Sequence, residues 1–293
     1  FVSDLANNRV LVFDLYFGGG DYYTADYVLG QPDFTSSSSG VTQTTMSQPT
    51  GLAYDDSNSR LFVSDHGNNR VLVYDVRAAG SGSQSSCGTS TTGIANGMNA
   101  SCVFGASDMV GGAPSGMPAT TDTPTGLAYD PTTKYLYVAS LLQNRVLVFD
   151  ADTAVLTSNG MDAFHVYGQM DFTGTTAGWD DLVYGSDVPS ARSLSSPQDI
   201  VLDSAGGLLY IADSVNGRVV VHDVSNVTVG TGGDSAIYAI GKPDLNTFNW
   251  LDPLNDPGGP YTETPRQDSL FTPRGVALDT TNGILYVSDS GYH

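Results

Sequence analysis

The chain has 293 residues, with 31 acidic residues against 11 basic ones and a formal net charge of −20. This charge excludes nucleic acid as a partner, because phosphate binding needs basic side chains, and it disfavours anionic membrane surfaces. Nearly all the acids are aspartates, since Glu263 is the single glutamate, and Lys134 and Lys242 are the only lysines. Helix surfaces usually draw on Glu and Lys, so the composition predicts strands joined by turns.

The sequence contains no apolar run long enough for a membrane helix. It begins with Phe1 rather than Met, and no signal peptide precedes the first strand-like segment. We therefore expect a mature product or an excerpt of a longer protein.

One segment recurs along the chain. It occupies residues 1–14 and appears most clearly at residues 63–75, as VSDHGNNRVLVYD. Further copies follow at 138–150 and 211–223, and another begins at 286–293. A recurring segment of this kind indicates a repeat architecture.

The second copy belongs to a unit of four predicted strands. Residues 49–55 form a short strand ending in Asp, residues 60–65 alternate as a strand should, and residues 70–75 follow a turn rich in Gly and Asn. A short fourth strand covers residues 102–105. The same order recurs with first strands at 124–130, 197–203 and 273–279, and with fourth strands at 27–30, 165–168 and 239–241.

Four short antiparallel strands per unit are the blade pattern of a β-propeller. A series of β-sandwich domains fits poorly, because each unit holds too few strand residues. We predict one all-β propeller domain over residues 1–293, with about four blade equivalents and incomplete terminal blades. The predicted blade segments are about 1–48, 49–122, 123–195, 196–271 and 272–293.

These motifs resemble those of the NHL repeat family. The resemblance rests on the PTGLAYD strand at 49–55, the YVSD strand at 286–289 and the NRVLVF strand at 144–149. The segment GQPDF at 30–34, which returns as GQMDF at 168–172, resembles the long-unit bacterial secreted subgroup. The resemblance implies four-stranded blades but no single activity, since sensors, RNA-binding modules, scaffolds and some enzymes share the repeat.

The two ends of the chain match each other, because residues 1–4 correspond to residues 286–289. Two arrangements follow. The ends could share one composite blade and close a four-bladed ring, or the chain could be an excerpt or open array. In the second arrangement, which we favour, exposed terminal strands could pair with another chain.

An Asp, an Asn and an Arg return in nearly every unit. A group repeated in each blade suits a structural role, in which Asp accepts turn amides and Arg ties blades together. In the third unit Ser140 replaces the Asp, so we expect that unit to lack part of the device. The predicted structural residues are Asp4, Asn8, Arg9, Asp65, Asn69, Arg70, Asn144, Arg145, Asp213, Arg218 and Asp289.

The links between blades are long and should lie on the same face as the turns between second and third strands. They span residues 31–48, 106–123, 169–196 and 242–272. Aromatic side chains in such loops suit a binding face, although they could instead fold back over the core. The candidates for this interaction face are Phe34, Phe172, Trp179, Tyr184, Trp250 and Tyr261.

The two cysteines, Cys87 and Cys102, bracket a polar loop and could form a disulfide in an oxidising compartment. Asn99 and Asn226 begin sequences that fit the N-glycosylation pattern. Aspartates at 55–58 and 251–259 offer calcium ligands without EF-hand spacing, so turn capping is the preferred interpretation. The histidines do not form a metal triad by spacing, and no nucleophile motif is present.

We therefore predict an extracellular or cell-surface propeller scaffold without enzymatic activity, cofactor or metal. It would bind protein or glycan through the link-bearing face and could self-associate through its terminal strands. One alternative is a propeller enzyme of the lyase or lactone-hydrolase kind with a metal in the central channel. Another is a sensor domain for a small ligand.

Overall fold

A computed structural model describes residues 1–14, 23–77, 93–110, 120–152, 158–177, 189–230, 232–246 and 267–291. Its strands form antiparallel sheets in which neighbours in the chain are neighbours in the sheet. The described part of the chain has two short 3₁₀ helices, η1 (Leu5–Asn7) and η2 (His66–Asn68), and no α-helix. The predicted all-β fold class is confirmed.

Three of the sheets have four strands each. The first of these contains β4 (Pro49–Asp55), β5 (Arg60–Asp65), β6 (Arg70–Asp75) and β7 (Cys102–Phe104). The next contains β8 (Pro124–Tyr129), β9 (Tyr135–Ser140), β10 (Arg145–Asp150) and β11 (His165–Tyr167). The last contains β12 (Pro197–Asp203), β13 (Leu208–Asp213), β14 (Arg218–Asp223) and β15 (Tyr238–Ile240).

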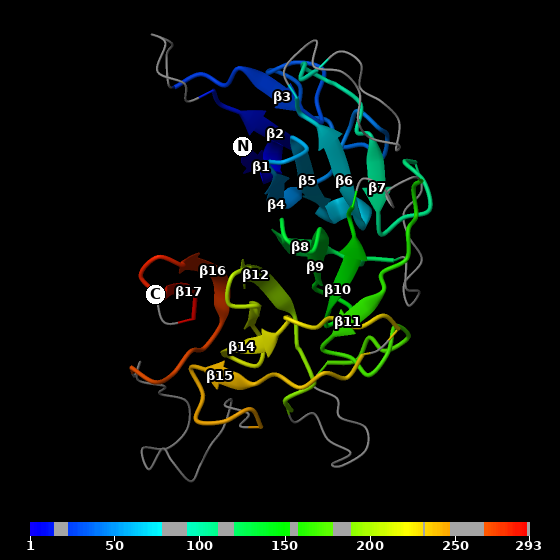
Figure 1. Ribbon diagram of the computed structural model, residues 1–293. Coiled ribbons are helices and arrows are strands. Elements are labelled where there is room, and N and C mark those ends of the chain that lie inside the picture. Colours follow the sequence, from blue (N-terminus) through cyan, green and yellow to red (C-terminus); the bar gives the residue numbers. More distant parts are fainter. Residues whose placement is uncertain are drawn as a thin grey trace. The chain divides into compact units, whose positions relative to one another are not determined.

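Two smaller sheets complete the described chain. One has three strands, β1 (Val2–Asp4), β2 (Arg9–Val12) and β3 (Tyr27–Leu29). The other has two, β16 (Pro273–Asp279) and β17 (Ile284–Asp289). Figure 1 labels most of these strands and colours them in chain order.

The contacts divide the chain into two compact units. Unit 1 is Phe1–Val138 with Phe149–Ala163, and unit 2 is Ala139–Val148 with Phe164–His293. In unit 1 the facing sides of neighbouring sheets bury a core that includes Val10, Met46, Leu61 and Leu72. Unit 2 buries the corresponding positions of its own strands, such as Leu209, Ile211 and Val219. The division into blade segments stays a prediction.

Local sequence explains the shape of each strand pair. The first strands begin with Pro, which needs no ladder partner at that position, and the register shifts by a bulge between Pro49 and Leu52 and between Pro197 and Ile200. The second and third strands pair in register from Asp65 opposite Arg70 outward. The same register pairs Asp4 with Arg9 and Asp213 with Arg218, so each of these Asp and Arg residues flanks the turn between its second and third strands.

Within the described ranges, no helix has the length and apolar character that crossing a membrane requires.

Candidate functional site

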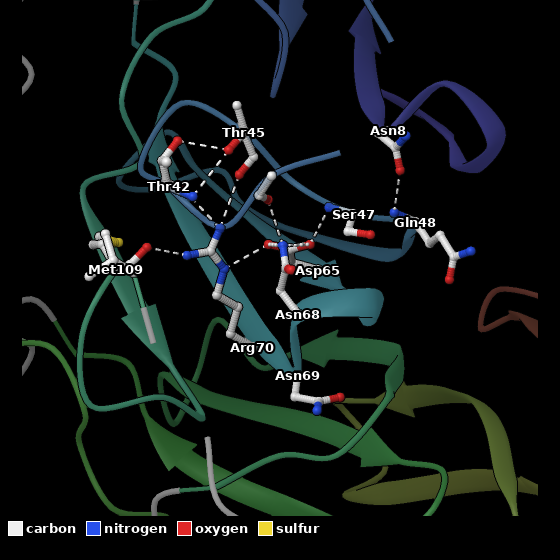
Figure 2. A network of polar contacts seen from close by, with 12 residues as sticks. Asn8, Thr42, Thr45, Ser47, Gln48, Asp65, Asn68, Asn69, Arg70 and Met109 are labelled. Carbon is white, nitrogen blue, oxygen red and sulfur yellow. Dashed lines mark hydrogen bonds and ion pairs between the residues drawn. The ribbon is translucent and has the colours of Figure 1, made fainter. Parts of the chain in front are cut away.

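The Asp–Asn–Arg motif of the β5–β6 hairpin forms a buried polar network (Figure 2). The Asp65 carboxylate accepts hydrogen bonds from the Ser47 amide at 2.6 Å, from Asn68 Nδ2 at 2.9 and 3.0 Å and from Arg70 Nε at 2.7 Å. Both side chains of the Asp65–Arg70 ion pair are fully buried. The carboxylate therefore closes the hairpin and holds the segment that leads into β4.

The same Arg70 guanidinium joins two links between blades. Its Nη2 donates to the carbonyl oxygens of Thr42 and Thr45, at 2.9 and 3.0 Å, and its Nη1 donates to the carbonyl of Met109. Thr42 and Thr45 precede β4, whereas Met109 follows β7. One buried side chain thus fixes both the entry and the exit of its sheet, as Figure 2 shows.

The Asn that ends each hairpin turn makes a second connection. Asn69 has φ 56°, a left-handed conformation that Asn tolerates better than most residues. Its Oδ1 accepts the amide of Thr123, the residue before β8, at 2.9 Å. Asn8 has φ 53° and accepts the amide of Gln48, the residue before β4, in the same way at 2.9 Å.

Unit 2 repeats the arrangement around Asp213. This carboxylate accepts the Ser195 amide at 2.6 Å, Asn216 Nδ2 at 2.8 Å and Arg218 Nε at 2.7 Å. Arg218 also donates to the carbonyl groups of Ser190 and Ser193 and to that of Leu245. Gly217, with φ 61°, stands where the other turns have Asn, so the side-chain connection is absent at this turn.

The third repeat, which forms β8–β11, keeps the polar network but uses a different acceptor. Gln143 Oε1 accepts hydrogen bonds from Ser140 Oγ at 2.9 Å and from Arg145 Nε at 3.1 Å, and Arg145 Nη1 donates to the carbonyl of Phe172. Asn144 accepts the Ser196 amide at 2.8 Å. We expected this repeat to lack part of the network, because Ser140 replaces the Asp, but Gln143 supplies the missing acceptor. The sequence signal is a Gln where the other turns have Asn7, Asn68 and Asn216.

The terminal copies of the motif are less buried. Asp4 pairs with Arg9 at 2.8 Å, and both side chains are partly exposed. Asp289 accepts the amides of Phe271 and Thr272, at 2.7 and 2.8 Å, on the segment before β16. Apart from Asp289, which ends β17, each predicted structural residue of the motif lies on the turn between a second and a third strand or directly flanks it.

Burial and charge act oppositely on these carboxyl groups. Burial raises the pKa of Asp65 and of Asp213, and the positive charge of the adjacent Arg opposes that rise. For the less buried Asp4, burial is outweighed by hydrogen bonds from Asn7 and Arg9 and by the Arg9 charge, so its pKa is lowered. Nothing in these contacts leaves the motif free to act on a substrate, because its donors and acceptors bind the chain itself.

The predicted aromatic face is described only in part. Phe34 is 41% exposed and Phe172 is half-buried. Arg9 Nη1 donates to the Phe34 carbonyl at 2.5 Å, as Arg145 does to that of Phe172. The other four candidates lie outside the described residues: Trp179, Tyr184, Trp250 and Tyr261.

Two aliphatic side chains that sequence reasoning missed are exposed on the links of unit 1, as Phe34 is. Val41 and Val110 are 36% and 64% exposed. Each follows a residue whose carbonyl the network holds, since Asn68 Nδ2 donates to Gly40 at 2.8 Å and Arg70 donates to Met109. We call Phe34, Val41 and Val110 the link face of unit 1. The sequence alone does not reveal this face, because it depends on hydrogen bonds between residues that are far apart in the chain.

A carboxylate stands in β12 where the other first strands have glycine. Asp199 accepts the Val276 amide of β16 at 3.0 Å and the Ile200 amide at 2.9 Å. Gly51, its counterpart in β4, has no room for a side chain, because a Cβ there would lie 2.1 Å from the Thr125 carbonyl oxygen. Burial raises the pKa of Asp199, and the two amides oppose that rise. The carboxylate serves to join two first strands.

The remaining candidates are placed as follows. Cys102 is buried in β7, and Cys87 lies outside the described residues, so the disulfide stays a prediction. Asn99 and Asn226 are both exposed. Asp55, in one of the two suggested calcium stretches, binds Arg60 at 2.7 Å and Asn58 at 2.8 Å, while residues 251–259 are not described. Among the residues with described positions, no three His, Cys, Asp or Glu side chains form a group that could hold a metal ion.

The chain repeats a four-stranded antiparallel sheet with a polar network at the turn between its second and third strands. This is the blade of a β-propeller repeat protein. The particular repeat is the NHL repeat: the family model of that description matches residues 46–74 and 194–221. Both segments contain a complete Asp–Asn–Arg or Asp–Gly–Arg turn. The chain thus carries NHL repeats, and membership of the long-unit bacterial secreted subgroup stays a prediction.

Solved structures that match the chain include the hydrazine synthase of Kuenenia stuttgartiensis, at 12% identity and a TM-score of 0.43, over 87% of this chain and 44% of that one. An auxiliary nutrient binding protein from Bacteroides ovatus matches at 13% identity and 0.46, over 85% and 47%. A Bacteroides uniformis protein provisionally named a 6-phosphogluconolactonase matches at 14% and 0.46, over 92% and 54%. The chain spans about half the length of these structures. No curated protein matches the chain.

Proposed function

We propose that this chain is a non-enzymatic interaction scaffold that binds a partner protein through the link face of unit 1. One observation carries the proposal: Phe34, Val41 and Val110 are exposed on segments whose carbonyl groups Arg9, Asn68 and Arg70 hold by hydrogen bonds. Apolar groups on a fixed backbone lose little conformational freedom on binding, which favours association. Their apolar character suits protein side chains better than sugar hydroxyl groups.

A defined probe tests this proposal. Peptides selected from a random phage-displayed library by the wild-type chain should lose about tenfold in affinity for the variant Phe34→Ser/Val41→Ser/Val110→Ser. The control is Val229→Ser, at a side chain that is 79% exposed in unit 2. Equal binding to the triple variant would remove the link face as the site, and specific binding on a glycan array in place of peptides would remove the protein partner.

The enzyme alternative has a separate test. Stoichiometric zinc or calcium in the purified chain, together with turnover of a lactone or of a lyase substrate, would replace the scaffold proposal. A chain without bound metal and without turnover is expected. Self-association through the terminal strands stays a prediction, which light scattering tests.

We further propose that the protein works outside the cytoplasm. The exposed side chains of Asn99 and Asn226 are accessible for glycosylation, and a bond between Cys87 and Cys102 would close the loop before β7. Expression in a secreting eukaryotic host should give glycan on both asparagines. Peptide mapping without reduction should recover the two cysteines as one linked pair, and free thiols in secreted material would contradict this localisation.

A further inference from the structure

The segment between β14 and β15 lies along the edge of β11. Its described residues are 224–230 and 232–237, and we call them the β14–β15 link. The Gly230 amide donates to the Phe164 carbonyl at 2.8 Å, and the Gly233 amide donates to the Gln169 carbonyl at 2.8 Å. The two acceptors lie before and after β11, so these bonds hold the link against the whole strand.

A buried histidine lies under this link. His165 is the first residue of β11, and its exposed fraction is 1%. Its Nδ1 lies 2.9 Å from the Thr228 carbonyl oxygen, and its Nε2 lies 2.6 Å from Asp234 Oδ2. Both partners belong to the link, so a single side chain of the strand contacts the link at two points.

The two contacts determine the protonation of the ring. A carbonyl oxygen and a carboxylate only accept hydrogen bonds, whereas a neutral imidazole has one donor nitrogen and one acceptor nitrogen. Both nitrogens of His165 must therefore donate, so the ring between these partners is an imidazolium. The Asp234 carboxylate balances its charge, as a buried cation requires.

The other titratable groups around this ring keep their charge state where histidine titrates. Asp234 faces the ring from the link, and Tyr167 faces it from β11 with ring centroids 4.6 Å apart. The His222 ring of β14 follows, 4.8 Å from that of Tyr167. Burial, with the charges of Arg218 and His165, lowers the pKa of His222 to about 3. His222 is therefore neutral over the range of about pH 5–8 in which histidine ordinarily changes charge.

Neutral groups cover the edges of β3 and β7 instead. The Val28 amide of β3 donates to Asn96 Oδ1 at 3.0 Å, and the Gly97 amide donates to the Val28 carbonyl at 3.0 Å. Asn159 and Gly160 make the same two bonds to the central residue of β7, at 3.1 and 3.3 Å. A change of pH near neutrality leaves these amide groups uncharged, so these two edges are internal controls for β11.

We propose that the β14–β15 link is a pH-sensitive flap, which the protonated ring of His165 holds on β11. Loss of one proton to water would leave a ring nitrogen that is an acceptor facing an acceptor oxygen, and would remove the ion pair with Asp234. Because the closed link favours the protonated ring, the link closes as the pH falls and loosens as the pH rises. His222 acts in the opposite direction, since it is buried as the neutral ring. The flap belongs to unit 2 and does not depend on the link face of unit 1.

Hydrogen exchange of the wild-type chain, followed by NMR between about pH 6 and 8, tests the flap. The protection factors of the link amides, Gly230 and Gly233, should fall at least about tenfold as the pH rises, as the loss of one charge-assisted hydrogen bond predicts. Those of the control amides, Gly97 and Gly160, should stay constant. The fall should follow the titration of the His165 ring in the same pH series.

A variant of the exposed partner tests the ion pair without disturbing the core. Asp234→Asn removes the charge from a half-exposed side chain, so the protection factors of the link amides should lose their dependence on pH. Asp162→Asn removes an exposed carboxylate three residues before His165, and should keep the wild-type dependence.

Several results would overturn the proposal. These are constant protection of the link amides in the wild type, an equal fall at the control amides, and a wild-type dependence in Asp234→Asn. Loss of the dependence in Asp162→Asn would show a general effect of charge and would overturn it as well. So would a His165 ring that NMR finds neutral at about pH 6, where the flap requires an imidazolium.

Discussion

At the scale of single residues, the distinguishing feature of the described chain is a set of fully buried arginines. Arg60, Arg70, Arg145 and Arg218 are among the largest fully buried side chains of the described chain. A buried guanidinium is tolerated only when acceptors surround it, because its desolvation is costly. Three of the four have an Asp partner, and Arg145 uses the neutral oxygen of Gln143.

Variants of Gln143 test whether its side-chain oxygen takes the place of the Asp carboxylate as the acceptor for Arg145. Gln143→Ala leaves donors of Arg145 and Ser140 without this oxygen, so we expect a loss of about 1–3 kcal/mol in the free energy of unfolding. Gln143→Glu restores a carboxylate beside the guanidinium and should be at least as stable as the wild type. Urea denaturation measures both, and a loss with Glu as large as that with Ala would contradict the acceptor role.

His222 makes stability depend on pH. Burial, with the charge of Arg218 and the proximity of His165, lowers the pKa of His222 to about 3 from the usual 6.5. The unfolded chain then binds the proton more tightly, so stability is full above pH 6.5 and falls as the pH falls toward 3. The expected slope is about 1.4 kcal/mol per pH unit. In urea titrations at several pH values, His222→Gln should lack this slope, and an unchanged slope would show that another group titrates.

At the scale of elements, the hairpin turn connects one sheet to the next. The left-handed turn residue is Asn8, Asn69, Asn144 or Gly217, and each Asn also binds the backbone just before the next first strand. One residue therefore serves two purposes, the local turn and the connection between blades.

Two replacements of Asn69 separate these purposes. Asn69→Gly keeps the left-handed conformation but loses the bond to the Thr123 amide, so we expect a cost of about 1 kcal/mol. Asn69→Ala loses the bond and adds about 1–2 kcal/mol of backbone strain. Thermal and urea unfolding of both variants measure the difference, and equal costs would mean that the turn is not strained.

At the scale of the whole molecule, two compact units each contain their own core and their own buried Asp–Arg pair. In repeat proteins each repeat contacts only its neighbours, so the free energy of unfolding is close to a sum of local contributions. The loss of one buried Asp–Arg pair should therefore destabilise the compact unit that contains it more than the other unit.

Matched variants test this locality. Arg70→Ala and Arg218→Ala each leave a buried carboxylate uncompensated, which should cost about 3–5 kcal/mol. Hydrogen exchange measured by mass spectrometry should rise mainly in unit 1 for Arg70→Ala and mainly in unit 2 for Arg218→Ala. Equal increases along the whole chain for both variants would show that the chain opens as a single cooperative block.

Much of the fold could be predicted because strand alternation and turn residues are local signals. The strands of the β4–β7 sheet begin at Pro49, Arg60, Arg70 and Cys102, as expected from residue order alone. The site was harder to predict. The acceptor role of Gln143 depends on where its amide points, and the positions of Val41 and Val110 depend on which carbonyl groups Asn68 and Arg70 hold.

The sequence by itself determined the repeat, the all-β class and the recurrence of Asp, Asn and Arg, because each follows from residues close together in the chain. Only the tertiary structure decided what those residues do. Arg70 is 28 residues from Thr42 and 39 residues from Met109 in the chain. Contacts over such separations depend on how sheets pack, which local propensity does not encode.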